Sequence, residues 1–142
     1  MLTSLAFVVG QFWIVVQNRF RGQKDPPAEK AIARVNEIPV GGTKLFHYPG
    51  EHDPCILLRV PAEPGAALEK TILAYDQKCT HLSCAVVPDL EQGCLHCPCH
   101  HGCFDLHSGR AIAGPPRRPL TRITLEIRAG VIFATGIELR TV

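Results

Sequence analysis

The sequence predicts an all-β fold: one antiparallel β domain with an inserted loop-rich lobe, preceded by an N-terminal helix. Short apolar runs bounded by Gly, Pro or charged residues recur along most of the chain. Two segments rich in Cys and His interrupt these runs, and no long helical period appears beyond the N-terminal segment. At 142 residues the chain is long enough for one domain with an appendage, but not for two.

Residues 1–17 predict a transmembrane helix that acts as an anchor. Apolar side chains surround the whole helical cylinder rather than one face. The length is at the short end of the ~17–25 residues that span a bilayer. Trp13, followed by Arg19, Arg21 and Lys24, is typical of a membrane–water interface. A cleaved signal peptide is the competing interpretation, but the segment has neither a basic leader nor a clear small-residue cleavage site.

Residues 18–33 predict a flexible linker. The chain turns polar there, and Gly22 and Pro26-Pro27 oppose a continuous helix. The two prolines favour extended geometry, so the linker should be semi-stiff. The β domain then occupies 34–142, with the loop-rich lobe at about 77–118.

The strands predicted for the β domain are short. In 121–128 apolar and polar residues alternate, so Ile123, Leu125 and Ile127 should share one buried face. Ala129-Gly130 then turns the chain into a closing hairpin. The predicted strands are 44–48, 56–60, 71–75, 121–128 and 131–134.

The lobe contains two boxes, Cys79-Thr80-His81-Leu82-Ser83-Cys84 and Cys97-Pro98-Cys99-His100-His101-Gly102. Each box offers one Cys and one His at ligand spacing, and a second Cys nearby. Two such pairs on adjacent loops supply two thiolates and two imidazoles. That is the ligand set of a Rieske 2Fe–2S centre, in which two His replace two Cys on one iron.

Structural zinc is the main alternative, because Cys2His2 is also a zinc set. Zinc gives no role to Cys84 or Cys99, and c-type haem is excluded because no Cys-x-x-Cys-His occurs.

Cys94 and Cys103 flank the second box. A second disulfide and two reduced, packed thiols fit them equally well. Cys55 has no obvious partner.

The two boxes resemble those of Rieske iron–sulfur proteins of the cytochrome bc-complex type. That type reads Cys-Thr-His-Leu-Gly-Cys and then Cys-Pro-Cys-His-Gly-Ser, and the similarity continues through Phe104-Asp105, Ser108-Gly109 and Gly114-Pro115-Pro116. The resemblance implies that Cys79 and Cys97 hold one iron and that His81 and His100 hold the other. It also implies a disulfide between Cys84 and Cys99.

The resemblance implies electron transfer as the iron–sulfur subunit of a membrane quinol-oxidising complex. The expected partners are membrane lipid, cytochrome b-type and c-type subunits, and a quinol. His81 and His100 would form the exposed tip, where they contact quinol and couple proton to electron transfer. No nucleic-acid partner is expected, because the formal charge is only +2 and aromatic residues make up 6%.

Two departures from the family pattern concern tuning of the redox potential. Gly102 and Phe104 occupy positions where the family usually has the hydroxyls of Ser and Tyr. Hydrogen bonds to sulfur raise the potential within the range of roughly −150 to +300 mV. We therefore expect a low-potential centre suited to a menaquinol-like donor, with Ser83, at a position usually Gly, as a partial substitute.

Two points stay open from sequence alone. The charges that follow the apolar segment favour a cytoplasmic domain, whereas the implied disulfide and the family favour the outer face; we expect the outer face.

The parent complex is the second open point. The alternatives are the Rieske small subunit of a membrane-associated molybdenum oxidoreductase of the arsenite oxidase kind, or a Rieske ferredoxin of an oxygenase system.

Overall fold

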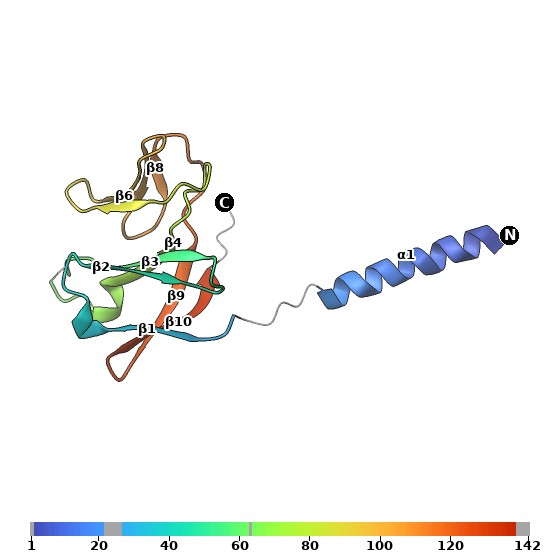
Figure 1. The fold of residues 1–142 in the computed structure, drawn as a ribbon, viewed down its shortest axis with the longest axis horizontal. Coiled ribbons are helices and arrows are strands. Elements are labelled where there is room, and N and C mark those ends of the chain that lie inside the picture. The colour runs from blue at the N-terminus through green and yellow to red at the C-terminus, as the bar shows by residue number, and fades with distance from the viewer. Residues whose placement is uncertain (1, 22–26, 63, 139–142) are drawn as a thin grey trace.

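The computed structural model describes residues 2–21, 27–62 and 64–138, and an N-terminal helix, α1 (Leu2–Arg21), precedes the β domain (Figure 1). The described side chains from Val8 to Val15 are exposed. Within the described part of the chain, no helix combines the length and the apolar content needed to cross a membrane. The transmembrane anchor predicted over 1–17 is therefore not supported, and the polar Gln17, Asn18 and Arg19 lower the mean hydropathy of α1.

The segment predicted as a flexible linker, 18–33, has regular structure at both ends. Helix α1 continues to Arg21, and strand β1 (Lys30–Arg34) begins before the predicted boundary. Residues 22–26 of this segment lie outside the described residues. Directly before β1, Pro27 lies close to the domain, since its carbonyl is 3.5 Å from the hydroxyl of Tyr48.

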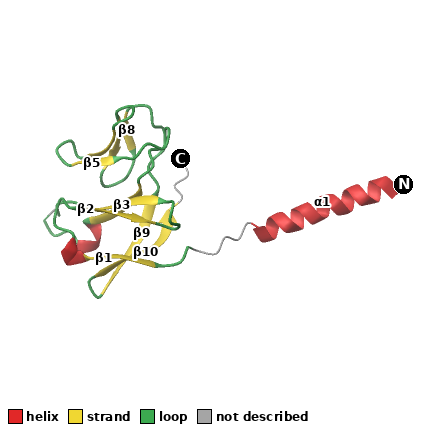
Figure 2. Ribbon diagram, viewed as in Figure 1, coloured by secondary structure: helices red, strands yellow, loops and turns green. Residues whose placement is uncertain are grey.

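The domain contains two antiparallel sheets, one above the other in Figures 1 and 2. The larger, which we call the base sheet, has six strands in the order β1-β10-β9-β4-β3-β2. The smaller forms the lobe and has four strands in the order β5-β6-β7-β8. Besides β1, the base strands are β2 (Thr43–His47), β3 (Pro54–Arg59), β4 (Ile72–Asp76), β9 (Arg122–Arg128) and β10 (Val131–Glu138). The lobe strands are β5 (Val87–Asp89), β6 (Cys94–Cys97), β7 (Gly102–Asp105) and β8 (Ala111–Ala113). Two short 3-10 turns, η1 (Val35–Glu37) and η2 (Leu68–Lys70), lie in the base.

Strand β3 separates two hydrophobic cores. Ile56 and Leu58 belong to the core on the lobe side, whereas Leu57 and Cys55 belong to the core on the other side of the base sheet. A strand that is buried on both faces reads as a continuous apolar run rather than as an alternation. This is why residues 55–58 stand out in the sequence as an unbroken apolar stretch.

The five strands predicted from sequence are all present in the base sheet, with ends shifted by a few residues. Ile123 is buried, and Leu125 and Ile127 pack against the same core, as the alternation predicts. The sequence missed β1 and all four lobe strands. The lobe strands are three or four residues long, so they offer too little pattern to be separated from loop.

Tyr75 on β4 connects the base sheet to the lobe. Its buried hydroxyl is within hydrogen-bonding distance of the carbonyls of Leu106 (2.9 Å) and His107 (2.8 Å). Gly109 lies against its ring, and a Cβ there would be only 2.7 Å from Cε1 of Tyr75. Gly109 also has φ of +70°, a conformation that suits glycine. The turn after β7 is thus seated directly on the base sheet.

Candidate metal centre

Two loops of the lobe carry the predicted ligands. The first ligand loop, 79–84, lies between β4 and β5, and the second, 97–102, links β6 to β7. The first loop closes on itself, because the amide of Cys79 donates to the carbonyl of Cys84 and the amide of Ser83 donates to the carbonyl of Cys79, both at 2.8 Å. These backbone hydrogen bonds define the shape of the loop.

The two predicted thiol ligands, Cys79 and Cys97, are buried and not disulfide-bonded. Burial raises the pKa of the Cys79 thiol, and the neighbouring Cys97 thiol acts in the same direction. The backbone amides of His81 and Leu82 act against this, since hydrogen bonds to the sulfur lower its pKa. The two sulfurs thus interact, and peptide N–H groups already favour the thiolate form of one.

The two predicted imidazole ligands lie on the outside. His81 and His100 are both exposed, and their ring centroids are 4.9 Å apart with an interplanar angle of 85°. The structure therefore brings together one imidazole from each loop, just as it brings together one thiol from each. The thiols are buried and the imidazoles face solvent.

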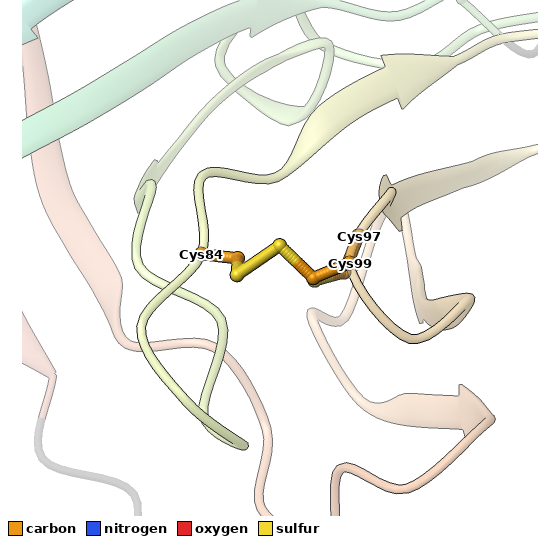
Figure 3. Close-up of side chains that lie close together, drawn as sticks. All are labelled: Cys84, Cys97 and Cys99. Carbon is orange, nitrogen blue, oxygen red and sulfur yellow. A yellow bond between two sulfur atoms is a disulfide. The ribbon is translucent and has the colours of Figure 1, made fainter.

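A disulfide between Cys84 and Cys99 cross-links the two ligand loops, with an S–S distance of 2.10 Å and Cα atoms 6.5 Å apart (Figure 3). The sulfur of Cys97 is close by, because all three sulfurs lie within 4.8 Å of one another. Bonded sulfurs carry no thiolate, so Cys84 and Cys99 cannot serve as metal ligands. The three sulfurs instead show that a free thiol lies directly beside the cross-link.

A second disulfide settles a point that the sequence left open. Cys94 and Cys103 are bonded across β6 and β7, and they close the segment that contains the second ligand loop. Cys55 is distant from the ligand loops in sequence and buried in the base, where desolvation raises its pKa to about 12. Among the seven cysteines, Cys55, Cys79 and Cys97 are free.

The predicted tuning positions have different surroundings. Phe104 is completely buried in the lobe-side core, and Ser83 is exposed with φ of +61°. Gly102 is buried, and a Cβ at this position would lie 2.7 Å from Cγ of Pro116. The space that a serine side chain would need at Gly102 is therefore filled by a proline ring. No local pattern in the sequence indicates this contact.

The segment 114–118 packs across both ligand loops. At one end, a Cβ on Gly114 would lie 2.8 Å from the carbonyl oxygen of His101, and Gly114 has φ of +81°. At the other end, the hydroxyl of Thr80 donates to the carbonyl of Arg118 at 2.7 Å. Glycine is required at 114 by both space and conformation. The segment thus fixes the second loop and the first loop against the same stretch of chain.

This donor set fits a 2Fe–2S cluster of mixed ligation. Two thiols and two imidazoles converge from two cross-linked loops, and each type is paired with its own kind. Mixed Cys2His2 ligation of two irons needs one iron held by sulfur and the other by nitrogen. The pairing of thiol with thiol and imidazole with imidazole meets that requirement.

The chain belongs to the Rieske [2Fe-2S] domain family, whose profile matches residues 28–125. A Rieske domain binds a 2Fe–2S cluster, so this cluster is the cofactor of the family to which the chain belongs. This match shows the Rieske domain family as a whole and does not distinguish the cytochrome bc-complex type within it.

The chain is also similar to two curated proteins and to one solved structure. It is 33% identical over 118 residues to the carotenoid phi-ring synthase of Chlorobaculum tepidum, covering 83% of this chain and 16% of that protein. It is 31% identical over 120 residues to the iodate reductase subunit IdrB of Denitromonas iodatirespirans, covering 80% and 64%. It superposes on the soluble domain of Rieske protein II (soxF) from Sulfolobus acidocaldarius with a TM-score of 0.64 at 25% identity, covering 81% and 82%. The chain thus spans less than two thirds of either curated relative.

The contact between Gly102 and Pro116 yields a stability prediction. Gly102→Ser is expected to lower the stability of the full chain by about 1–3 kcal/mol, because the new side chain must displace a buried proline ring. Adding Pro116→Ala to Gly102→Ser should recover part of this loss. Chemical denaturation of the three proteins measures the effect.

Gly136→Ser is the matched control for that prediction. A Cβ at Gly136 would meet Thr124 at an ordinary 3.5 Å, so this serine should change stability little. Equal stability of Gly102→Ser and the unmodified protein would show that Pro116 leaves room for a side chain there.

Proposed function

We propose that Cys79 and Cys97 hold one iron of the cluster and that His81 and His100 hold the other. Burial of the thiols and exposure of the imidazoles support this assignment. When bound, the cluster supplies a one-electron redox couple. The residues of this chain orient it: the thiols lie inside the lobe, and the imidazoles are the part of the site that a partner can touch.

We infer that the protein is an electron-transfer subunit, and that electrons enter and leave through the His81–His100 tip. The observation that carries this proposal is the exposed imidazole pair, whose ring centroids are 4.9 Å apart. The two thiol ligands, in contrast, are buried. Electron transfer needs close approach and no substrate pocket. A quinol hydroxyl could hydrogen-bond to either exposed ring, which would make the same rings the place where a proton leaves the quinol.

For the parent complex, we propose a membrane quinol-oxidising complex of the cytochrome bc type, with cytochrome b-type and c-type subunits as partners. The Cys84–Cys99 cross-link supports this choice over an oxygenase ferredoxin, since the resemblance implies that such ferredoxins usually lack the extra Cys pair. Association with membrane lipid belongs to the same proposal and rests only on the sequence of residues 1–17.

The second candidate is the Rieske small subunit of a membrane-associated molybdenum oxidoreductase. The observation that favours it is the 31% identity to an iodate reductase subunit over 80% of this chain. That relative is itself a subunit of a reductase, so the same electron-carrying role would serve a different complex.

Two further parts of the proposal concern potential and location. Gly102 and Phe104 offer no hydroxyl to a cluster sulfur, which supports a low potential suited to a menaquinol-like donor. The two disulfides support the outer face of the membrane, because disulfides persist in oxidising compartments. Protease treatment of intact cells that carry a C-terminally tagged chain tests the location: a protected tag would contradict it.

The ligand assignment predicts the outcome of single substitutions. The full chain should contain two irons and two acid-labile sulfides, and its reduced form should show the low average g-value of mixed His/Cys ligation. His81→Ala and His100→Ala should each abolish this signal, whereas His107→Ala, an exposed histidine in the turn after β7, should preserve it. Stoichiometric zinc without labile sulfide, in protein made with ample iron, would contradict the assignment.

The parent complex is tested by purifying the natively expressed chain with its partners after mild detergent extraction. A bc-type complex predicts b-type haem in the purified assembly, together with quinol oxidation. A molybdenum oxidoreductase predicts a molybdopterin-containing subunit. Recovery of an oxygenase component with neither group would refute both candidates and favour a ferredoxin.

The proposed low potential predicts an effect at Phe104. Phe104→Tyr should raise the midpoint potential by tens of millivolts if its hydroxyl reaches a sulfur. A neutral hydrogen bond nets ~0.5–1.5 kcal/mol, and ~1.4 kcal/mol corresponds to ~59 mV for one electron. Phe133→Tyr, in the base sheet, should leave the potential unchanged. Voltammetry at one pH compares the three proteins, and an unchanged or lower value for Phe104→Tyr would argue that the missing hydroxyl does not set the potential.

A further inference from the structure

Two arginines lie in the segment 114–118, which contacts both ligand loops. Arg117 and Arg118 are both exposed, and they lie in the segment that packs across the two ligand loops. The ring of Pro116 fills the space over Gly102, and the carbonyl of Arg118 accepts the hydroxyl of Thr80. The backbone that carries the two guanidinium groups is thus fixed to both ligand loops at neighbouring positions.

Neither arginine has an ion-pair partner among the described residues. Among the described residues, the ion pairs involve Lys44, Lys78 and Arg128, and none involves Arg117 or Arg118. No Asp or Glu occurs in residues 77–88, 95–104 or 106–125, which together include both ligand loops and the segment between β8 and β9.

The acidic residues of the lobe lie at its other end or are already bonded. Asp89 and Glu91 border the turn between β5 and β6, and β6 runs from that turn to the second ligand loop, so this turn is at the far end of the strand. Asp105 ends β7, and Ser108 holds its pKa low by hydrogen bonding. In the base, Asp53 pairs with Lys78 at 3.1 Å, and Asp76 accepts a hydrogen bond from the amide of Lys78 at 2.8 Å. The lobe is therefore polarised, with unpaired positive charge at the ligand end.

We propose that Arg117 and Arg118 form a docking site for an acidic electron-transfer protein, which they hold against the His81–His100 tip. This inference rests on the proposed electron-transfer role and adds the kind of partner. Complementary charge steers diffusional encounter and fixes orientation more than it adds affinity. Two exposed guanidinium groups on backbone that contacts both ligand loops would orient an acidic surface with its redox group facing the tip.

The test measures electron transfer from the reduced, cluster-containing full chain to two soluble c-type cytochromes, one acidic and one basic, by stopped-flow absorbance. At low ionic strength the acidic cytochrome should react faster, and its rate should fall as salt is added. Arg117→Gln/Arg118→Gln should lower that rate about three- to tenfold and flatten its dependence on salt.

The matched control is Lys70→Gln/Arg110→Gln, which removes the same charge away from the ligand loops. Both residues are exposed, Arg110 lies in the turn after β7, and Lys70 lines a pocket with His107 of that same turn. The control should change the rate less than twofold. Equal losses in both double variants would overturn the proposal, because net charge rather than a docking site would then set the rate.

Other outcomes separate this inference from the proposed function. Equal rates with the acidic and basic cytochromes would overturn the docking site and leave the electron-transfer role intact. A cluster-containing chain that dithionite reduces but that reduces neither cytochrome would overturn the electron-transfer role, and the docking site with it. If the arginine variant keeps its rate but loses flotation with phosphatidylglycerol vesicles, the two arginines bind an anionic lipid surface, and the proposal fails.

Discussion

The Cys84–Cys99 cross-link holds two loops together that come from different parts of the chain, and the candidate site exists only where those loops meet. Each loop alone offers one thiol and one imidazole, which would leave a metal half coordinated. With the loops joined, Cys79 faces Cys97 and His81 faces His100. A cross-link restricts the unfolded chain more than the folded one, so it favours the arrangement without having to touch the metal.

The cross-linked loops in turn need a fixed support, and the base sheet provides it. Tyr75 reaches from β4 to two carbonyls of the turn after β7, and Gly109 allows close packing on its ring. Strands β3 and β4 are buried on both faces, so the sheet that carries Tyr75 is itself constrained from two sides. The lobe is therefore seated on the base, which suits a subunit that presents one small exposed tip to its partner.

The segment 114–118 combines structure and proposed function. Gly114 and Pro116 pack on the second ligand loop, and the carbonyl of Arg118 accepts a hydrogen bond from the first. The same contacts hold the backbone of Arg117 and Arg118 against the two ligand loops. They also exclude a side chain at Gly102, where the resemblance implies a serine. The ring of Pro116 thus occupies the space that the side chain of that hydrogen-bond donor would need.

The sequence by itself determined the fold class, the five main base strands and the types of donor available, because alternation, unbroken apolar runs and Cys/His spacing are local patterns. It could not locate the lobe strands, which are too short to show a period. It left Cys94 and Cys103 open, because cysteine spacing does not specify pairing. Only the tertiary structure decided that these two are bonded, that Pro116 fills the space over Gly102, and that the linker segment continues into β1. Each of these depends on how separate segments pack, as when β1 pairs with β10, and no local pattern in the sequence records that packing.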